Sequence, residues 1–201
     1  MEETIPWSEY DEDDLDATQR AFADVLADRA GSWNVDPLST VLMPAPRTPY
    51  RRLMAYLDID GPERDRGVLT VGCHFDGSTV RGDKLHNQDF ALPRLATEFA
   101  LAATGDAVAV ANRAADWFEA ILARPLVRRE WLHAGKVYAV RYEYADTGRG
   151  LGEGFEDPLA PPEVQERLAA EGVVRGRGRI NRSGLGEPDR AVHVRGNRPA
   201  P

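Results

Sequence analysis

The stretch VGCHFDGSTVRGDKLHNQD, residues 71–89, concentrates the side-chain types that could do chemistry. It holds the single cysteine of the chain, two of the four histidines and three aspartates. A thiol beside an imidazole could form a nucleophilic pair, and imidazoles with carboxylates could act as general acid and base or bind a metal ion. A small enzyme with its site in this stretch is therefore one hypothesis. Its candidate residues are His74, Asp76, Arg81, Asp83, His86 and Asp89.

The dipeptide Asp76-Gly77 predicts that this stretch is a β-hairpin. With these two residues as the loop, the predicted cross-strand pairs are Phe75 with Ser78, His74 with Thr79, and Cys73 with Val80. Side chains alternate between the two faces of a strand, so Cys73 falls on the apolar face and His74 on the opposite face. The two side chains therefore cannot pair with each other, and Cys73 is expected to be a buried structural thiol.

Established signatures of catalysis and ligand binding do not occur in the sequence. There is no GxSxG elbow, no HExxH, no GxGxxG in register and no Walker-type phosphate loop. The Arg-Gly-Asp triplet at 81–83 is explained most simply as a chance match, and the acidic run DEDDLD as a solubilising helix cap. We therefore expect no metal site and no cofactor, and the catalytic candidates reduce to His74, Asp76, Asp83 and His86.

The composition is that of a globular protein in a reducing compartment. Hydrophobic residues make up 42% of the chain and charged residues 29%. A single cysteine excludes an internal disulfide. The acidic start lacks the basic and apolar regions of a signal peptide, and no uncharged run approaches the roughly 20 residues that a membrane helix needs. These features predict a cytoplasmic protein without a membrane partner.

The net charge of −8 is unevenly distributed. Residues 1–163 carry 17 Lys/Arg against 29 Asp/Glu, and residues 164–201 carry 8 Arg against 4 Asp/Glu. The acidic body discourages attraction to nucleic acid. The segment RGRGRINR could track phosphates, but residues 172–201 contain no aromatic side chain to stack on a base. A nucleic-acid-associated protein acting through this tail is therefore a less favoured hypothesis.

Periodicity and turn residues predict the order helix, three strands, helix, two strands, short helix. The predicted elements are a helix that begins after Asp16 and ends near Gly31, strands at 50–60, 68–75 and 78–83, a helix at 106–123, a hairpin at 126–146 with Ala134-Gly135 as its loop, and a helix at 161–171. In the first helix, Asp16 and Gln19 have the spacing of a capping box. The four prolines in residues 34–49 predict an extended or looped segment.

This order predicts an α+β fold in which an antiparallel sheet of about five strands carries its helices on one face. We expect an acidic segment at 1–15, a single domain at 16–171 and a disordered Arg/Gly-rich tail at 172–201. The element order resembles that of type III secretion chaperones. The resemblance is one of topology without a shared motif, so it implies no role for any residue.

The leading hypothesis is a noncatalytic, protein-binding module of the adaptor, chaperone-like or immunity type. It rests on the lack of a convergent acid, base and nucleophile, and on an acidic body suited to a basic partner. Aromatic and arginine side chains are enriched in protein interfaces. The candidate partner-binding residues on the second hairpin are Trp131, Arg141, Tyr142 and Tyr144.

Overall fold

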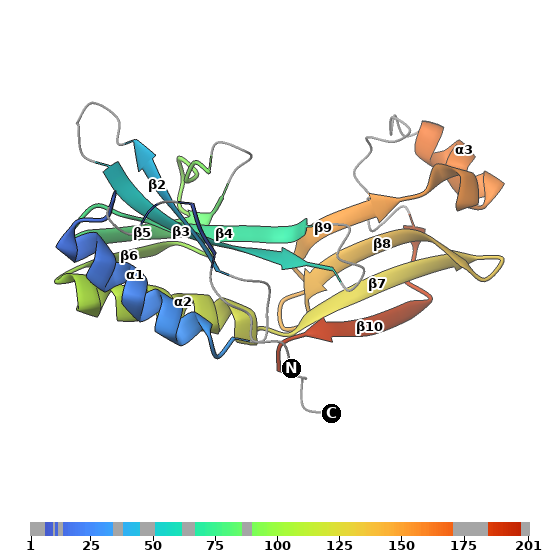
Figure 1. Ribbon diagram of the computed structural model, residues 1–201. Coiled ribbons are helices and arrows are strands. Elements are labelled where there is room, and N and C mark those ends of the chain that lie inside the picture. The colour runs from blue at the N-terminus through green and yellow to red at the C-terminus, as the bar shows by residue number, and fades with distance from the viewer. Residues whose placement is uncertain are drawn as a thin grey trace. The chain divides into compact units, whose positions relative to one another are not determined.

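The computed structural model describes residues 7–9, 11, 14–33, 38–44, 51–61, 67–85, 90–170 and 185–197. The chain divides into two compact units, Met1–Ile121 and Leu122–Pro201. The elements, most of which are labelled in Figure 1, are β1 (Trp7–Glu9), α1 (Ala17–Ala30), β2 (Ser39–Pro44), β3 (Arg51–Asp60), β4 (Gly67–Phe75), β5 (Thr79–Lys84), β6 (Leu101–Thr104), α2 (Ala107–Ala123), β7 (Leu126–His133), β8 (Lys136–Tyr144), β9 (Gly150–Phe155), α3 (Pro162–Ala170) and β10 (Arg190–Arg195), with a 3₁₀ turn, η2 (Asp157–Leu159), before α3.

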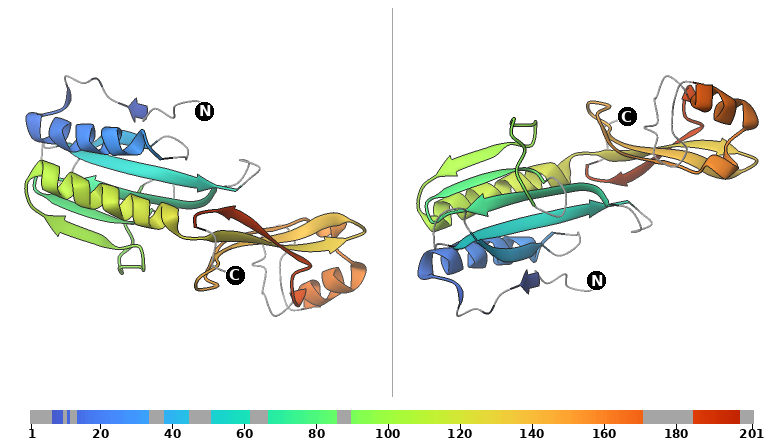
Figure 2. Two further views of the ribbon diagram at one scale, coloured as in Figure 1. Left: turned by 90° about the horizontal axis from the view of Figure 1, so that it is seen from below. Right: turned by 90° about the horizontal axis from the view of Figure 1, so that it is seen from above.

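The first unit is a sheet with the strand order β1-β2-β3-β4-β5-β6. Strands β2 to β6 are antiparallel neighbours, and β1 adds a short parallel pairing to β2. Helices α1 and α2 lie side by side along one face of this sheet (Figure 2). This confirms the predicted α+β class with antiparallel strands and helices on one face.

Helix α1 begins where its capping residues predict. The Asp16 carboxylate accepts hydrogen bonds from the backbone N–H groups of Thr18 and Gln19, and the Gln19 side chain accepts one from the N–H of Asp16. The ring of Phe22 stacks on that of Phe75 in β4, with centroids 4.2 Å apart and an interplanar angle of 8°. The cap thus sets the start of the helix, and this aromatic pair holds it against the sheet.

Helix α2 starts after Asp106, whose carboxylate accepts from the N–H of Ala109. The helix buries Val110, Ala111, Ala114, Ala115, Phe118 and Ile121. The predicted helix is confirmed. Val108, in its first turn, is 49% exposed, because it lies at the edge of the buried arc, which centres on Ala114 and Phe118.

The hairpin between β4 and β5 forms, with a different loop from the one predicted. Asp76 and Thr79 close the turn, since the Asp76 N–H donates to the Thr79 carbonyl and the Asp76 carboxylate accepts from the Thr79 N–H. The loop is therefore Gly77-Ser78, with Gly77 at φ 98°. The observed pairs are Phe75 with Val80, His74 with Arg81, and Cys73 with Gly82. The register moves by two residues, so every side chain keeps its predicted face.

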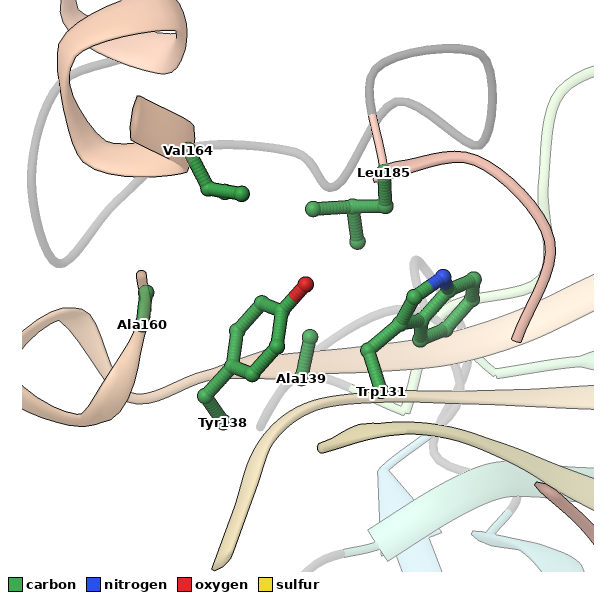
Figure 3. Packing of buried hydrophobic residues seen from close by; sticks show 6 residues of the cluster. All are labelled: Trp131, Tyr138, Ala139, Ala160, Val164 and Leu185. Atoms are coloured by element: carbon green, nitrogen blue, oxygen red, sulfur yellow. The ribbon is translucent and has the colours of Figure 1, made fainter. Parts of the chain in front are cut away.

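The second unit is a four-stranded antiparallel sheet of order β10-β7-β8-β9. Ala134 and Gly135, at φ 49° and 77°, form the predicted loop between β7 and β8. Helix α3 covers part of one face of the sheet. There, six buried side chains from strands, helix and loops converge into one cluster: Trp131, Tyr138, Ala139, Ala160, Val164 and Leu185 (Figure 3).

Two predictions about the strands are wrong. The second hairpin does not extend the first sheet but forms its own with β9 and β10. The division between the two compact units falls inside the range 16–171. The tail prediction fails at residues 190–195, which form β10. Strand β10 is fixed by antiparallel pairing to β7 rather than by an apolar pattern of its own. Residues 171–184 and 198–201 lie outside the described residues.

Candidate functional site

The face of the first sheet that does not carry α1 and α2 presents a group of basic side chains. His74 of β4 lies between Met54 of β3 and Arg81 of β5 in the cross-strand register. Arg52 lies two residues before Met54 on β3, and so shares this face and is a diagonal neighbour of His74. We refer to Arg52, His74 and Arg81 as the His74 site.

A segment that follows β5 covers part of the same face. We define this cover segment as residues 85 and 90–99. The ring of Phe90 packs against that of Tyr56, with centroids 4.8 Å apart. The Asp83 carboxylate accepts hydrogen bonds from the backbone N–H and the hydroxyl of Thr97. These contacts hold the cover segment against the sheet beside the His74 site.

His74 has one satisfied ring nitrogen and one unsatisfied ring nitrogen. Its Nε2 lies 3.0 Å from the carbonyl oxygen of Phe90. Because a carbonyl oxygen can only accept, Nε2 carries the proton, and Nδ1 is an acceptor in the neutral ring. Nδ1 is buried, and no described group is within hydrogen-bonding distance of it. The side chain is 8% exposed, and this burial lowers the pKa of His74, with the Arg52 charge acting in the same direction.

Arg52 adds a second unsatisfied buried atom to this face. Its Nε is buried, and no described group accepts from it, although the residue as a whole is half-buried. Arg81 is exposed. A buried donor on Arg52 and a buried acceptor on His74 therefore occur on the same face, and buried polar groups without partners are rare enough to need an explanation.

The predicted catalytic residues do not converge on His74. Asp83 is 4% exposed and anchors Thr97 and the Lys84 N–H, and Asp76 accepts from Thr79 in the turn. None of the described aspartates hydrogen-bonds to His74. His86 and Asp89 lie outside the described residues. Burial of Asp83 also removes the last residue of the Arg-Gly-Asp triplet from the surface.

Cys73 is the buried thiol that the hairpin pattern predicts. It is 0% exposed on the helix-facing side of β4, and burial raises the pKa of its thiol to about 12. The thiolate, which is the reactive form, is therefore scarce near neutral pH.

Of the four candidate partner-binding residues of the second unit, three are buried and Arg141 is half-buried. Trp131 belongs to the cluster in Figure 3, and Tyr142 and Tyr144 are 4% and 2% exposed. The Nε of Arg141 lies 3.4 Å from the carboxylate of Glu143, which is itself buried and also binds Arg129 Nε at 2.9 Å. The negative charge of Glu143 therefore balances the positive charge of these arginines within the sheet.

A second buried carboxylate, that of Glu130 in β7, lies on the face of the second sheet opposite to Glu143. Glu130 is 3% exposed and pairs with the Nε atoms of Arg128, at 2.9 Å, and of Arg190 in β10. The pairing with Arg190 supplies an ionic link between β10 and β7 in addition to the backbone ladder. We interpret both carboxylates as structural, because each pairs with one arginine of its own strand and one of a neighbouring strand.

Strand β6 ends the first sheet, and no strand of the described part of the chain pairs with its outer edge. The Gly105 N–H donates to the Ser78 carbonyl. Because hydrogen-bonded pairs recur every two residues in an antiparallel ladder, Ala103 and Leu101, which lie opposite Val80 and Gly82, also bond to β5. The N–H and C=O groups of Ala102 and Thr104 then point away from β5. Both residues are exposed. This edge is the second candidate site of the first unit.

Sequence reasoning did not identify Arg52, Phe90 or the β6 edge. The period-two pattern of β3 contained a signal for Arg52, since it alternates with the apolar Leu53, but only the strand pairing places it near His74. Phe90 has a positive φ of 48°, which an aromatic residue rarely adopts and which no pattern predicts. Strand β6 is too short, at four residues, to show alternation.

Among the described residues, no group of three or more His, Cys, Asp or Glu side chains is arranged to hold a metal ion. In the same part of the chain, no helix is both long and apolar enough to cross a membrane. Comparison with protein-family models, with curated proteins and with solved structures finds no match.

Proposed function

We propose that the protein is a noncatalytic binding module that takes up an extended segment of a partner protein along β6. The observation that carries this proposal is the free edge of β6, where Ala102 and Thr104 direct their backbone groups outward. A partner strand can pair with such an edge through main-chain hydrogen bonds, and its side chains then supply specificity.

The other described sheet edges carry features that discourage such pairing. The outward residues of β9 include Glu153, β10 has arginines at both ends, and β1 is only three residues long. Charged side chains and short strands are the usual protection of an edge. Strand β6, with the sequence Leu-Ala-Ala-Thr, is also short but has neither a charge nor a proline.

Apolar side chains flank β6 in the chain. Leu95, in the cover segment, is 84% exposed, and Val108, in the first turn of α2, is 49% exposed. These are the exposed large hydrophobic residues of the described structure. An added strand could bury them, which would contribute about 25 cal/mol for each Å² of apolar surface removed from water.

The charge of the first unit favours a basic segment. Residues 1–121 carry 11 Lys/Arg against 22 Asp/Glu, a net charge of −11, and residues 122–201 carry 14 against 11, a net charge of +3. The acidic unit would accelerate association with a positively charged partner and repel acidic competitors. Because the composition is that of a globular protein with a single cysteine, we place the binding of the partner segment in the cytoplasm.

The test is a selection of displayed peptides against the full-length protein, followed by a comparison of three proteins. Ala102→Pro removes an outward N–H and leaves the ladder to β5 in place. Glu153→Pro makes the same change at the outward edge of β9 and is the matched control. We expect selected peptides to be rich in lysine and arginine, and to bind Ala102→Pro about tenfold or more weakly than the wild type.

Binding to Glu153→Pro should stay within about twofold of the wild type, because that edge is not the docking site. Thermal unfolding of each variant shows whether the fold is intact. Peptides that bind Ala102→Pro as tightly as the wild type would contradict docking at β6.

A further inference from the structure

The His74 site contains two buried polar atoms that lack a hydrogen-bond partner among the described residues. Arg52 Nε is a donor without a described acceptor, and His74 Nδ1 has no described partner. Arg52 and His74 are diagonal neighbours on the same face of the sheet, so the two side chains are close enough to interact. A single oxygen atom between them could satisfy both atoms.

A water molecule or an anion could supply this oxygen. A water would accept from Arg52 and donate to Nδ1 of the neutral imidazole. An anionic oxygen would accept from Arg52 and also from Nδ1, once His74 has taken up a proton from solvent. In that state, both contacts are charge-assisted hydrogen bonds, which are stronger than neutral ones.

The surrounding charges favour the anion. Arg52 comes from β3 and Arg81 from β5, where it is the direct cross-strand neighbour of His74. Among the described residues, the aspartates of the β4–β5 hairpin are already engaged: Asp83 binds Thr97 and the Lys84 N–H, and Asp76 binds the Thr79 N–H. The described part of the cover segment adds one charge of each sign, Arg94 and Glu98, so it does not change the balance.

We propose that Arg52, His74 and Arg81 form a binding site for a small oxyanion, a phosphate or carboxylate group. Arg52 and His74 supply the buried donors, and the exposed Arg81 supplies charge at the entrance. The Phe90 carbonyl holds Nε2–H and so directs Nδ1 toward the ligand. This inference does not rest on the proposed binding of a peptide at β6.

The experiment follows the titration of the His74 ring by NMR in the full-length protein. The His74 signal is assigned with His74→Gln. Inorganic phosphate and acetate are added separately, in a buffer that contains neither group. We expect at least one of them to raise the pH at which His74 protonates, because the bound anion stabilises the imidazolium. A response to phosphate alone or to acetate alone supports the site and identifies the class of ligand.

Variants distinguish the site from general attraction of anions. Arg52→Gln should weaken binding of the effective anion about tenfold or more, since it removes a charge-assisted hydrogen bond. Arg52→Lys keeps the charge without the Nε–H and should also weaken binding, which preserves the test if the glutamine variant fails to fold. Arg113→Gln, an exposed change on α2 across the sheet, should leave binding unchanged.

Two results would overturn the proposal. If neither phosphate nor acetate moves the titration of His74, the two buried atoms share only a water molecule. If Arg52→Gln and Arg113→Gln weaken binding equally, the anion responds to overall charge rather than to this site.

Discussion

Leu85 lies directly over Gly72, at the point where the cover segment meets the first sheet. A Cβ atom built on Gly72 would be 2.6 Å from Cδ1 of Leu85 and 2.8 Å from the backbone oxygen of Ala55. No real Cβ atom tolerates such distances. Because Gly72 has no side chain, Leu85 can pack directly against the sheet, where it is buried at 5% exposure.

Gly72→Ala should lower the free energy of unfolding by about 1–3 kcal/mol, because overpacking forces the backbone or the cover segment to move. Urea denaturation measures the effect. The control is Gly67→Ala on the same strand, where the nearest atom to a new Cβ is 3.7 Å away. That change should alter stability by less than about 1 kcal/mol. Equal losses would mean that Leu85 does not occupy the described position.

Phe118→Ala should destabilise the protein by about 3–5 kcal/mol, because the side chain is fully buried and its loss leaves a cavity. Val108→Ala on the same helix is the control, and should change the unfolding free energy by less than about 0.5 kcal/mol. Chemical denaturation measures the change in unfolding free energy for both variants. A loss below about 1 kcal/mol for Phe118→Ala would show that this face of α2 does not pack on the sheet.

His74 should make stability depend on pH between neutral and mildly acidic conditions. Burial lowers its pKa from the ordinary value of 6.5, so the folded protein binds fewer protons here than the unfolded chain. The contribution of His74 is therefore complete above about pH 6.5 and is lost as the pH falls through that value toward the lower folded pKa.

Urea denaturation at several pH values tests this dependence, in a buffer free of phosphate and carboxylate. His74→Gln should reduce the loss of stability on acidification, because the variant has no imidazole to protonate. His133→Gln, at an exposed position, should retain the dependence of the wild type. If both variants behave alike, the neutral buried state of His74 is incorrect.

Gly196 holds the end of β10 against the backbone of Ala123 and Arg124 within the second unit, and its replacement should release β10. A Cβ at this position, with φ 76°, would lie 2.0 Å from the backbone oxygen of Arg124. Gly186→Ala is the control, since Gly186 has a similar φ of 75° with no atom within 4 Å. Gly186→Ala should cost about 1–2 kcal/mol for the positive φ alone.

Gly196→Ala should cost about 1–3 kcal/mol more than this control, because the clash involves backbone that cannot move aside. Hydrogen exchange should show the loss of protection in the amides of β10. Equal costs for the two variants would mean that only the backbone conformation of Gly196 matters.

The sequence by itself determined the elements whose signals are local. The capping box of Asp16 and Gln19 and the loop at Ala134-Gly135 depend on hydrogen bonds or dihedral angles within a few residues. The alternation in residues 51–60 and 68–75 likewise placed Cys73 and His74 on opposite faces. The hairpin loop was misplaced by one residue, yet the faces were correct because side chains repeat every two residues.

Only the tertiary structure decided the grouping of strands and the composition of both candidate sites. Strands β6, β9 and β10 are short, glycine-rich or charged, and each is stabilised by the ladder of a neighbour rather than by its own pattern. The His74 site joins residues from three strands, and its unsatisfied atoms depend on which groups the cover segment brings near. Such contacts depend on long-range packing, which a periodic pattern in one segment does not specify.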